Sequence, residues 1–137
     1  MREHFIHLFE NQVIKNGSAD ALIFNNEKLS YGELNNKANQ LAHYLRSCGV
    51  GPNVLVGISI KRSFDQNYPV SRLNFMLIHS RATILLTCES EIGRKLYAKK
   101  GRTICVNKNA NNISKESCEN LSITTKSSDL GYAIYTS

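Results

Sequence analysis

The cysteine and histidine residues are the side chains of this sequence that could bind a metal ion. The chain has four cysteines, Cys48, Cys88, Cys105 and Cys118. None of them forms a Cys-x-x-Cys pair, whereas structural zinc sites are usually built from such close pairs. His4 and His7 lie about one helical turn apart, but no cysteine lies near them. The spacing therefore favours buried or incidental thiols and surface histidines on an amphipathic helix, and we predict no metal site.

Charge and hydropathy limit the classes of partner. The net charge is +6 and the isoelectric point is near 9.3, which raises nucleic acid as a partner. The densest basic run, residues 94–102, holds one aromatic residue and no nucleic-acid motif, so a solvated helix face is the better interpretation. No run approaches the ~18 apolar residues of a membrane helix, and no apolar core follows residues 1–4. We expect a cytoplasmic chain with neither a membrane nor a nucleic-acid partner.

The N-terminal elements are marked by helical periodicity and turn residues. The chain has 137 residues, of which 42% are hydrophobic and 20% charged, as in a single globular domain. A helix is predicted over residues 3–16, because apolar side chains recur on one face at Phe5, Leu8, Phe9 and Val13. Residues 21–24 and 28–30 then predict a small hairpin, with Asn25 and Asn26 as its turn.

A second helix has the clearest start signal in the chain. Ser30 and Glu33 fit a capping box, in which each side chain accepts a hydrogen bond from the backbone amide of the other residue. Gly49 is a natural stop. The predicted core-facing stripe is Leu34, Ala38, Leu41, Ala42 and Leu45. The residues expected on the opposite, polar side are Asn35, Asn36, Asn39 and Arg46.

Further along, buried strands alternate with helices. The nearly continuous apolar run at residues 54–60 predicts a parallel strand covered on both faces. Further strands are expected at residues 83–87, 103–106 and 131–136. Helices are expected after Pro69 and over residues 90–100, and the polar stretch 107–128 predicts a loop with a short helix. The alternation indicates an α/β fold with a mainly parallel sheet flanked by helices.

Several short segments, in order along nearly the whole chain, share one resemblance. They include residues 7–13 (HLFENQV), 29–35 (LSYGELN), 38–46 (ANQLAHYLR), 84–87 (ILLT) and 129–137 (DLGYAIYTS). Together they resemble the start of an adenylation domain of a nonribosomal peptide synthetase, in the acyl-adenylate-forming superfamily of AMP-dependent synthetases and ligases. The resemblance implies that residues 1–137 are a truncated adenylation domain, its N-terminal part only, with the α/β fold of a partial N-terminal subdomain.

The sequence departs from the family pattern after residue 65. The family normally has a helix and a strand there, including an Ala-Gly-x-Tyr-x-Pro-Leu-Asp-Pro type of segment. In this chain Ser63, Phe64 and Asp65 run almost directly into Tyr68 and Pro69. The resemblance therefore implies that one strand-and-helix unit is deleted between Asp65 and Gln66, which leaves one buried strand without a neighbour.

A second departure concerns phosphate binding. In the family a Thr-Ser pair is followed by a glycine-rich stretch and a lysine, and the backbone amides of such a loop wrap phosphates. Here the sequence has Thr136 and Ser137 and no glycine-rich stretch after them. The resemblance implies that the two hydroxyls are the start of an incomplete phosphate loop. The alternative is two polar residues at a chain end.

The resemblance also implies a reaction. The family joins an amino acid to ATP, with Mg²⁺, to give an aminoacyl-adenylate and pyrophosphate, and passes the acyl group to a carrier thiol. We predict no catalytic residue, no cofactor and no adenylation activity for this chain alone, as an inactive remnant. The alternatives are a split-enzyme piece complemented by another chain, with that chain or a carrier domain as partner, and a non-enzymatic protein-interaction module.

Overall fold

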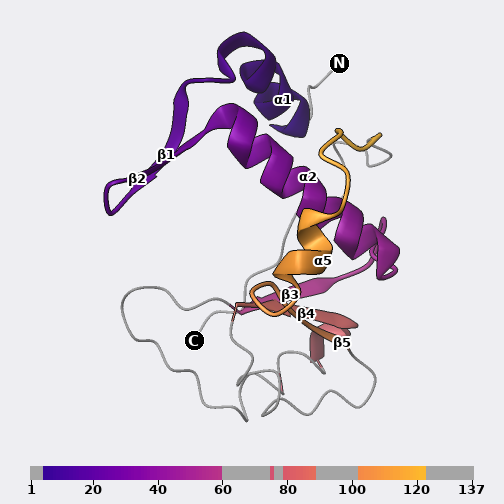
Figure 1. Ribbon diagram of the computed structural model, residues 1–137. Helices are drawn as coiled ribbons and strands as arrows, with labels where there is room; N and C mark the ends of the chain where they lie inside the picture. The colour runs from indigo at the N-terminus through magenta and orange to yellow at the C-terminus, as the bar shows by residue number, and fades with distance from the viewer. Residues whose placement is uncertain (1–4, 60–74, 76–78, 89–101, 123–137) are drawn as a thin grey trace. The chain divides into compact units, whose positions relative to one another are not determined.

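The computed structural model describes residues 5–59, 75, 79–88 and 102–122 (Figure 1). The chain divides into two compact units. The first consists of residues 1–48 and 114–131, and the second of residues 49–113 and 132–137. No helix in the described ranges is both long and apolar enough to cross a membrane.

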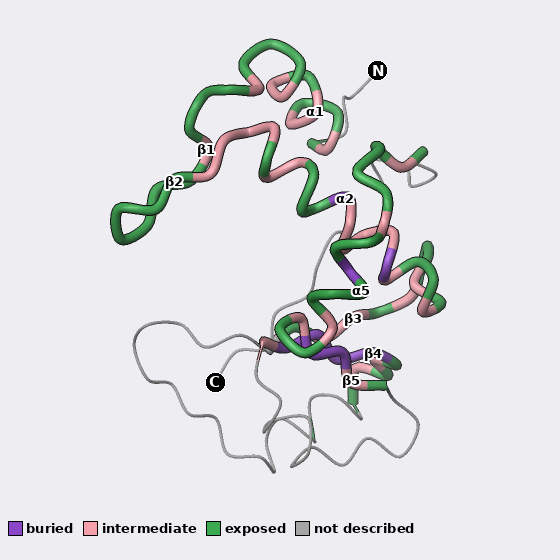
Figure 2. Tube along the Cα trace, viewed as in Figure 1, coloured by how far each residue is buried: buried purple, intermediate pink, exposed green. Residues whose placement is uncertain are grey.

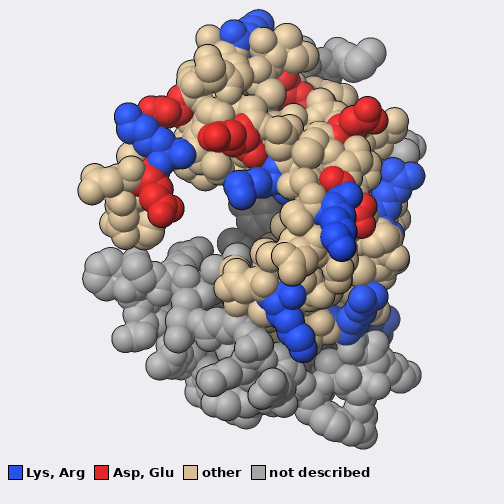
Figure 3. Space-filling view, viewed as in Figure 1, with Lys and Arg blue, Asp and Glu red and all other residues tan. Residues whose placement is uncertain are grey.

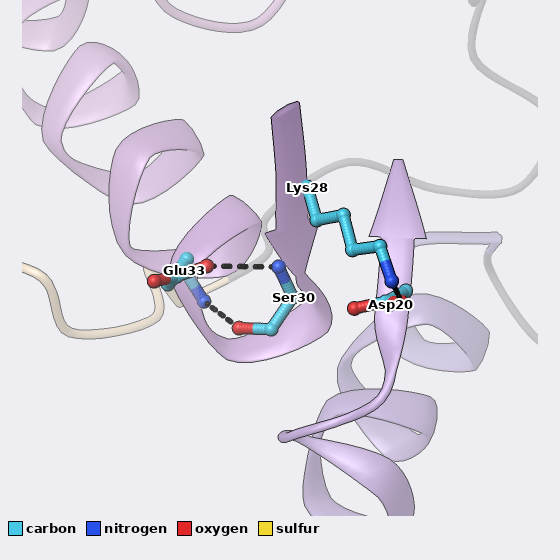
Figure 4. Close-up of polar contacts among 4 residues, drawn as sticks. All are labelled: Asp20, Lys28, Ser30 and Glu33. Carbon is cyan, nitrogen blue, oxygen red and sulfur yellow. Dashed lines mark hydrogen bonds and ion pairs between the residues drawn. The ribbon is translucent and has the colours of Figure 1, made fainter. Parts of the chain in front are cut away.

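The first unit begins with a helix and a hairpin. Helix α1 covers Phe5–Asn16, and strand β1 (Asp20–Phe24) pairs antiparallel with β2 (Glu27–Ser30). The turn residues Asn25 and Asn26 have φ angles of 47° and 67°, the left-handed conformation that a tight hairpin turn requires. The structure confirms both the predicted helix and the predicted hairpin. An exposed ion pair of 3.5 Å between Lys28 and Asp20 joins the two strands (Figure 4) and contributes little at the surface.

The apolar stripe of α1 is only partly covered. Phe9 and Val13 are half-buried, and the ring of Phe9 lies 6.1 Å from the ring of Tyr31. Phe5 and Leu8, on the other flank of the stripe, are 71% and 53% exposed. The predicted face is therefore real, but only half of it is in contact with the rest of the unit.

Helix α2 covers Tyr31–Ser47 and begins as predicted. The Glu33 amide donates to Ser30 Oγ at 3.2 Å, and the Ser30 amide donates to Glu33 Oε2 at 2.9 Å (Figure 4). This reciprocal pair satisfies two amides that a helix start leaves without intrahelical partners. Cys48 caps the far end, and Gly49 follows with a φ of +98°, which glycine adopts at little cost.

One sequence-based prediction for α2 is wrong. Asn39 was expected on the solvent side with the other polar residues, but it is 7% exposed. Tyr44 is the other buried residue of the helix, whereas Ala38 of the predicted apolar stripe is exposed. The reason is that residues 118–120 lie against the polar face of α2 and hydrogen-bond to it.

The second unit is built around a parallel sheet in the order β3-β4-β5. The strands are β3 (Val56–Ser59), β4 (Ile84–Thr87) and β5 (Arg102–Cys105), and Val56, Ile84 and Arg102 are in register. The core of the described residues lies here, because every residue of β4 is buried and Ile104 of β5 is 1% exposed (Figure 2). Helix α5 (Ala110–Ser114) follows β5 and buries Ile113. The structure confirms the α/β class, the parallel sheet and the short helix in the polar stretch.

Strand β3 was predicted to be covered on both faces, and one of its residues is not. Ile58 of β3 is 67% exposed, because nothing among the described residues covers its side chain. The predicted helices after Pro69 and over residues 90–100, the predicted strand at residues 131–136 and the inferred deletion after Asp65 all lie outside the described residues.

Candidate functional site

The carboxyl edge of the parallel sheet is where an α/β fold normally binds a ligand. Thr87 ends β4 and is completely buried, with 0% exposure, and Cys105 ends β5 at 7% exposure. The Val106 amide donates to the Thr87 carbonyl at 2.8 Å, so the ladder continues one residue beyond the strands. The parallel pairing of β4 and β5 therefore fixes where the residue after each strand begins.

In the loop after β5, two asparagine side chains hydrogen-bond to main-chain carbonyls at this edge of the sheet. Asn107 Nδ2 donates to the Cys88 carbonyl at 2.9 Å, and the Cys105 thiol reaches the same oxygen at 3.5 Å. Asn109 donates to the Cys105 carbonyl through both its amide and its side chain, each at 2.9 Å. Side chains of the loop thus bond to the carbonyls of both Cys88 and Cys105 and cover the ends of the two strands.

The described part of this edge uses its polar side chains in hydrogen bonds within the chain. The polar side chains of Asn107, Asn109 and Cys105 here hydrogen-bond to the Cys88 and Cys105 carbonyls, and Lys108, in the same loop, is the described cation nearest to them in sequence and is exposed. Within the described ranges no group of three or more His, Cys, Asp or Glu residues could hold a metal ion. The residues seen here therefore act as scaffold.

The residues predicted to touch phosphate, Thr136 and Ser137, lie outside the described residues, as does His4 of the histidine pair. All four cysteines are free thiols; Cys105 is buried, Cys48 and Cys88 are half-buried and Cys118 is exposed. Arg102 is the one described member of the basic run. Basic and acidic side chains are interspersed over much of the described surface in view (Figure 3).

The polar face of α2 is a binding surface that was not predicted from the sequence. Asn35, Asn39 and His43 recur every four residues, which places them on one side of the helix. A row of side-chain donors with this spacing indicates that the helix face binds a set of hydrogen-bond acceptors. In the structure the row holds residues 118–120 of the same unit.

Comparison with protein families gives one match, to the family described as AMP-binding enzyme, over residues 9–66. Two curated relatives extend the similarity over nearly all of the chain. A linear gramicidin synthase of Brevibacillus parabrevis is 36% identical over 99% of this chain. Zwittermicin A synthase ZmaJ of Bacillus cereus is 38% identical over 95% of it. The chain spans 3% of the first relative and 28% of the second.

Solved structures agree on the fold. The nonribosomal peptide synthetase FmoA3 matches 94% of this chain with a TM-score of 0.79 at 23% identity, and the match covers 16% of FmoA3. NpsA of Klebsiella oxytoca matches 91% with a TM-score of 0.75 at 17% identity, and the match covers 29% of that chain. Residues 9–66 therefore match the AMP-binding enzyme family, and nearly the whole chain is homologous to adenylation domains of nonribosomal peptide synthetases.

Proposed function

We propose that residues 1–137 are the N-terminal part of an adenylation domain that, in full, activates an amino acid with ATP and transfers it to a carrier thiol. The observation that carries the proposal is the parallel sheet β3-β4-β5, within a fold that matches 94% of the chain to FmoA3. This part of the domain contributes scaffold: a core around β4 and β5, and the capped start of α2.

We also propose that one strand-and-helix unit is deleted after Asp65. The family match runs from residue 9 to residue 66, which is the inferred point of deletion. The alignment to the linear gramicidin synthase is 156 positions long, although the chain has only 137 residues. The relative therefore has residues for which this chain has no counterpart, which supports a shortened domain.

The 137-residue chain is expected to be inactive by itself. Adenylate formation depends on electrostatic stabilisation of the phosphates by cations and backbone amides, and Thr136 and Ser137 are the only phosphate-binding residues that we propose for this chain. We expect no ATP–pyrophosphate exchange above background with any amino acid in a mixture of all twenty, measured with radiolabelled pyrophosphate and Mg²⁺.

The control for this assay is an intact adenylation domain, run at the same concentration. Exchange above background by the purified chain would overturn the proposed inactivity. A thermal melt with and without ATP and Mg²⁺ separates folding from binding, because a ligand that binds only the folded state raises the melting temperature. A cooperative transition that ATP leaves unchanged is the expected result.

A second candidate function is that of a split-enzyme piece, in which another chain supplies the rest of the domain. The observation that favours it is a run of three exposed apolar residues in β1: Leu22, Ile23 and Phe24 are 53%, 67% and 68% exposed. Together with Phe5 and Leu8 of α1 they leave apolar surface that a partner would cover. Such surface also suits an interaction module without catalysis.

Co-expression tests the split-enzyme candidate. We expect that, if it holds, the chain together with the remaining part of an adenylation domain gives amino-acid-dependent exchange that neither part gives alone. Ile23→Ser and Phe24→Ser should then reduce the exchange, while Lys37→Ser, at an exposed position of α2, should not. A stable complex with one stoichiometric partner but without exchange would favour the interaction module instead.

A further inference from the structure

The polar face of α2 holds a specific segment of the same unit. Four side chains of the helix, those of Asn35, Asn39, Gln40 and His43, hydrogen-bond to residues 114–120. The bonds reach the main-chain carbonyls of Ser114, Cys118 and Glu119 and the side chain of Asn120. In Figure 1 this segment follows α5 and runs beside α2. We refer to residues 114–120 as the strap.

The centre of this contact is an amide network with a fixed direction. Asn39 Nδ2 donates to the Cys118 carbonyl and to Asn120 Oδ1, each at 2.8 Å, and so uses both of its hydrogens. Asn35 Nδ2 donates to the same Asn120 oxygen at 3.0 Å. A carbonyl can only accept, so the Asn39 amide must present its nitrogen to Cys118. Asn39 is therefore the donor of the network, and Asn120 is the acceptor.

Hydrogen bonds rather than apolar packing hold the strap. Ser114, Lys115 and residues 117–120 are exposed, whereas Asn39 beneath them is 7% exposed. Gln40 donates to the Ser114 carbonyl at 3.0 Å, and His43 Nε2 lies 2.9 Å from the Glu119 carbonyl. Within the strap, the Glu119 amide donates to Ser117 Oγ at 3.1 Å. A segment attached in this way can leave the helix without exposing a core.

We propose that the strap is a latch: it opens from α2 as one unit, ahead of global unfolding, and the donor–acceptor direction of the Asn39–Asn120 pair keeps it closed. Opening would expose a row of amide donors on α2 that fits the carbonyls of an extended chain segment. The proposal goes beyond the nucleotide chemistry considered above and does not depend on it. The feature that makes it testable is the direction of the hydrogen bond: Asn39 donates and Asn120 accepts.

The test applies the same substitution, asparagine to aspartate, to both members of the pair in the full chain. Asn39→Asp replaces two donors with carboxylate oxygens that face the Cys118 carbonyl and Asn120 Oδ1, so the latch should open. Asn120→Asp keeps an acceptor for Asn35 and Asn39, and the exposed position leaves the new charge in water. Both variants add one negative charge and change almost no volume. They differ in hydrogen-bond direction and in burial, because Asn39 is 7% exposed and Asn120 is exposed, so the charge itself also costs more at Asn39.

The readout is limited proteolysis with trypsin, followed by mass spectrometry. Cleavage needs an opened backbone, and its rate follows the population of the open form when opening is fast. At Lys115, inside the strap, Asn39→Asp should raise the cleavage rate by at least about tenfold, since two hydrogen bonds are lost and the negative carboxylate faces two carbonyl oxygens. Asn120→Asp should stay within about threefold of the parent rate. Cleavage at Lys108, before α5, is the internal control and should not change.

Gln40→Ala keeps the test decisive if Asn39→Asp fails to fold. It removes one bond at the edge of the network and should raise cleavage at Lys115 by roughly threefold, the effect of one net hydrogen bond. Three results would overturn the latch. These are equal acceleration by the two aspartate variants, cleavage at Lys108 rising in step with Lys115, and no effect of Gln40→Ala.

Discussion

Replacing Ile104 with alanine is expected to destabilise the chain by about 2–5 kcal/mol, the range for removing a large aliphatic side chain from a packed core. Ile104 is the most buried large hydrophobic residue described, at 1% exposure, and lies in β5 beside the fully buried β4. Losing its side chain leaves a cavity that the flanking parallel strand cannot easily fill. The measurement is urea unfolding followed by far-ultraviolet circular dichroism.

Ile58→Ala is the matched control, because it makes the same chemical change in the same sheet. Ile58 lies in β3 and is 67% exposed, so the change should cost less than about 0.5 kcal/mol, as at ordinary surface positions. Equal losses at the two positions would mean that Ile58 is covered in solution, by another part of the chain or by a second molecule. A small loss at Ile104 would contradict the position of the core.

Signals that act over a few residues allowed much of the first unit to be predicted. The capping box needs only Ser30 and Glu33, three residues apart, and both of its hydrogen bonds form as expected. The hairpin turn needs only two residues that tolerate positive φ, and Asn25 and Asn26 supply them. In such cases the partners are near neighbours in sequence, so the local pattern contains the whole interaction.

The candidate functional surfaces depend on partners far away in sequence. Asn39 bonds to Cys118, 79 residues later. The spacing of the polar residues on α2 indicates a binding surface, but it does not indicate which distant segment binds there. The apolar run that forms β3 predicts a strand correctly, but the exposure of Ile58 depends on which segments cover it. The phosphate-binding proposal for Thr136 and Ser137 rests on family resemblance alone.

Replacing Gly49 with alanine is expected to destabilise the chain by about 1–2 kcal/mol, the cost of a left-handed backbone for a residue with a Cβ atom. Gly49 follows the C-terminal cap of α2 with a φ of +98°. A Cβ atom added there would meet nothing within 4 Å, so steric contact with other residues adds nothing to the cost. Urea unfolding of the variant measures the change.

Gly51→Ala isolates the backbone conformation as the cause. An added Cβ at Gly51 also meets nothing within 4 Å, but its φ lies outside the left-handed range. Alanine restricts the unfolded chain more than glycine does, so this variant should be neutral or more stable by up to about 1 kcal/mol. Opposite signs at two glycines two residues apart would show that α2 ends where it does because Gly49 permits a left-handed residue. A loss of the same size at both positions would instead mean that other residues cover this loop in solution.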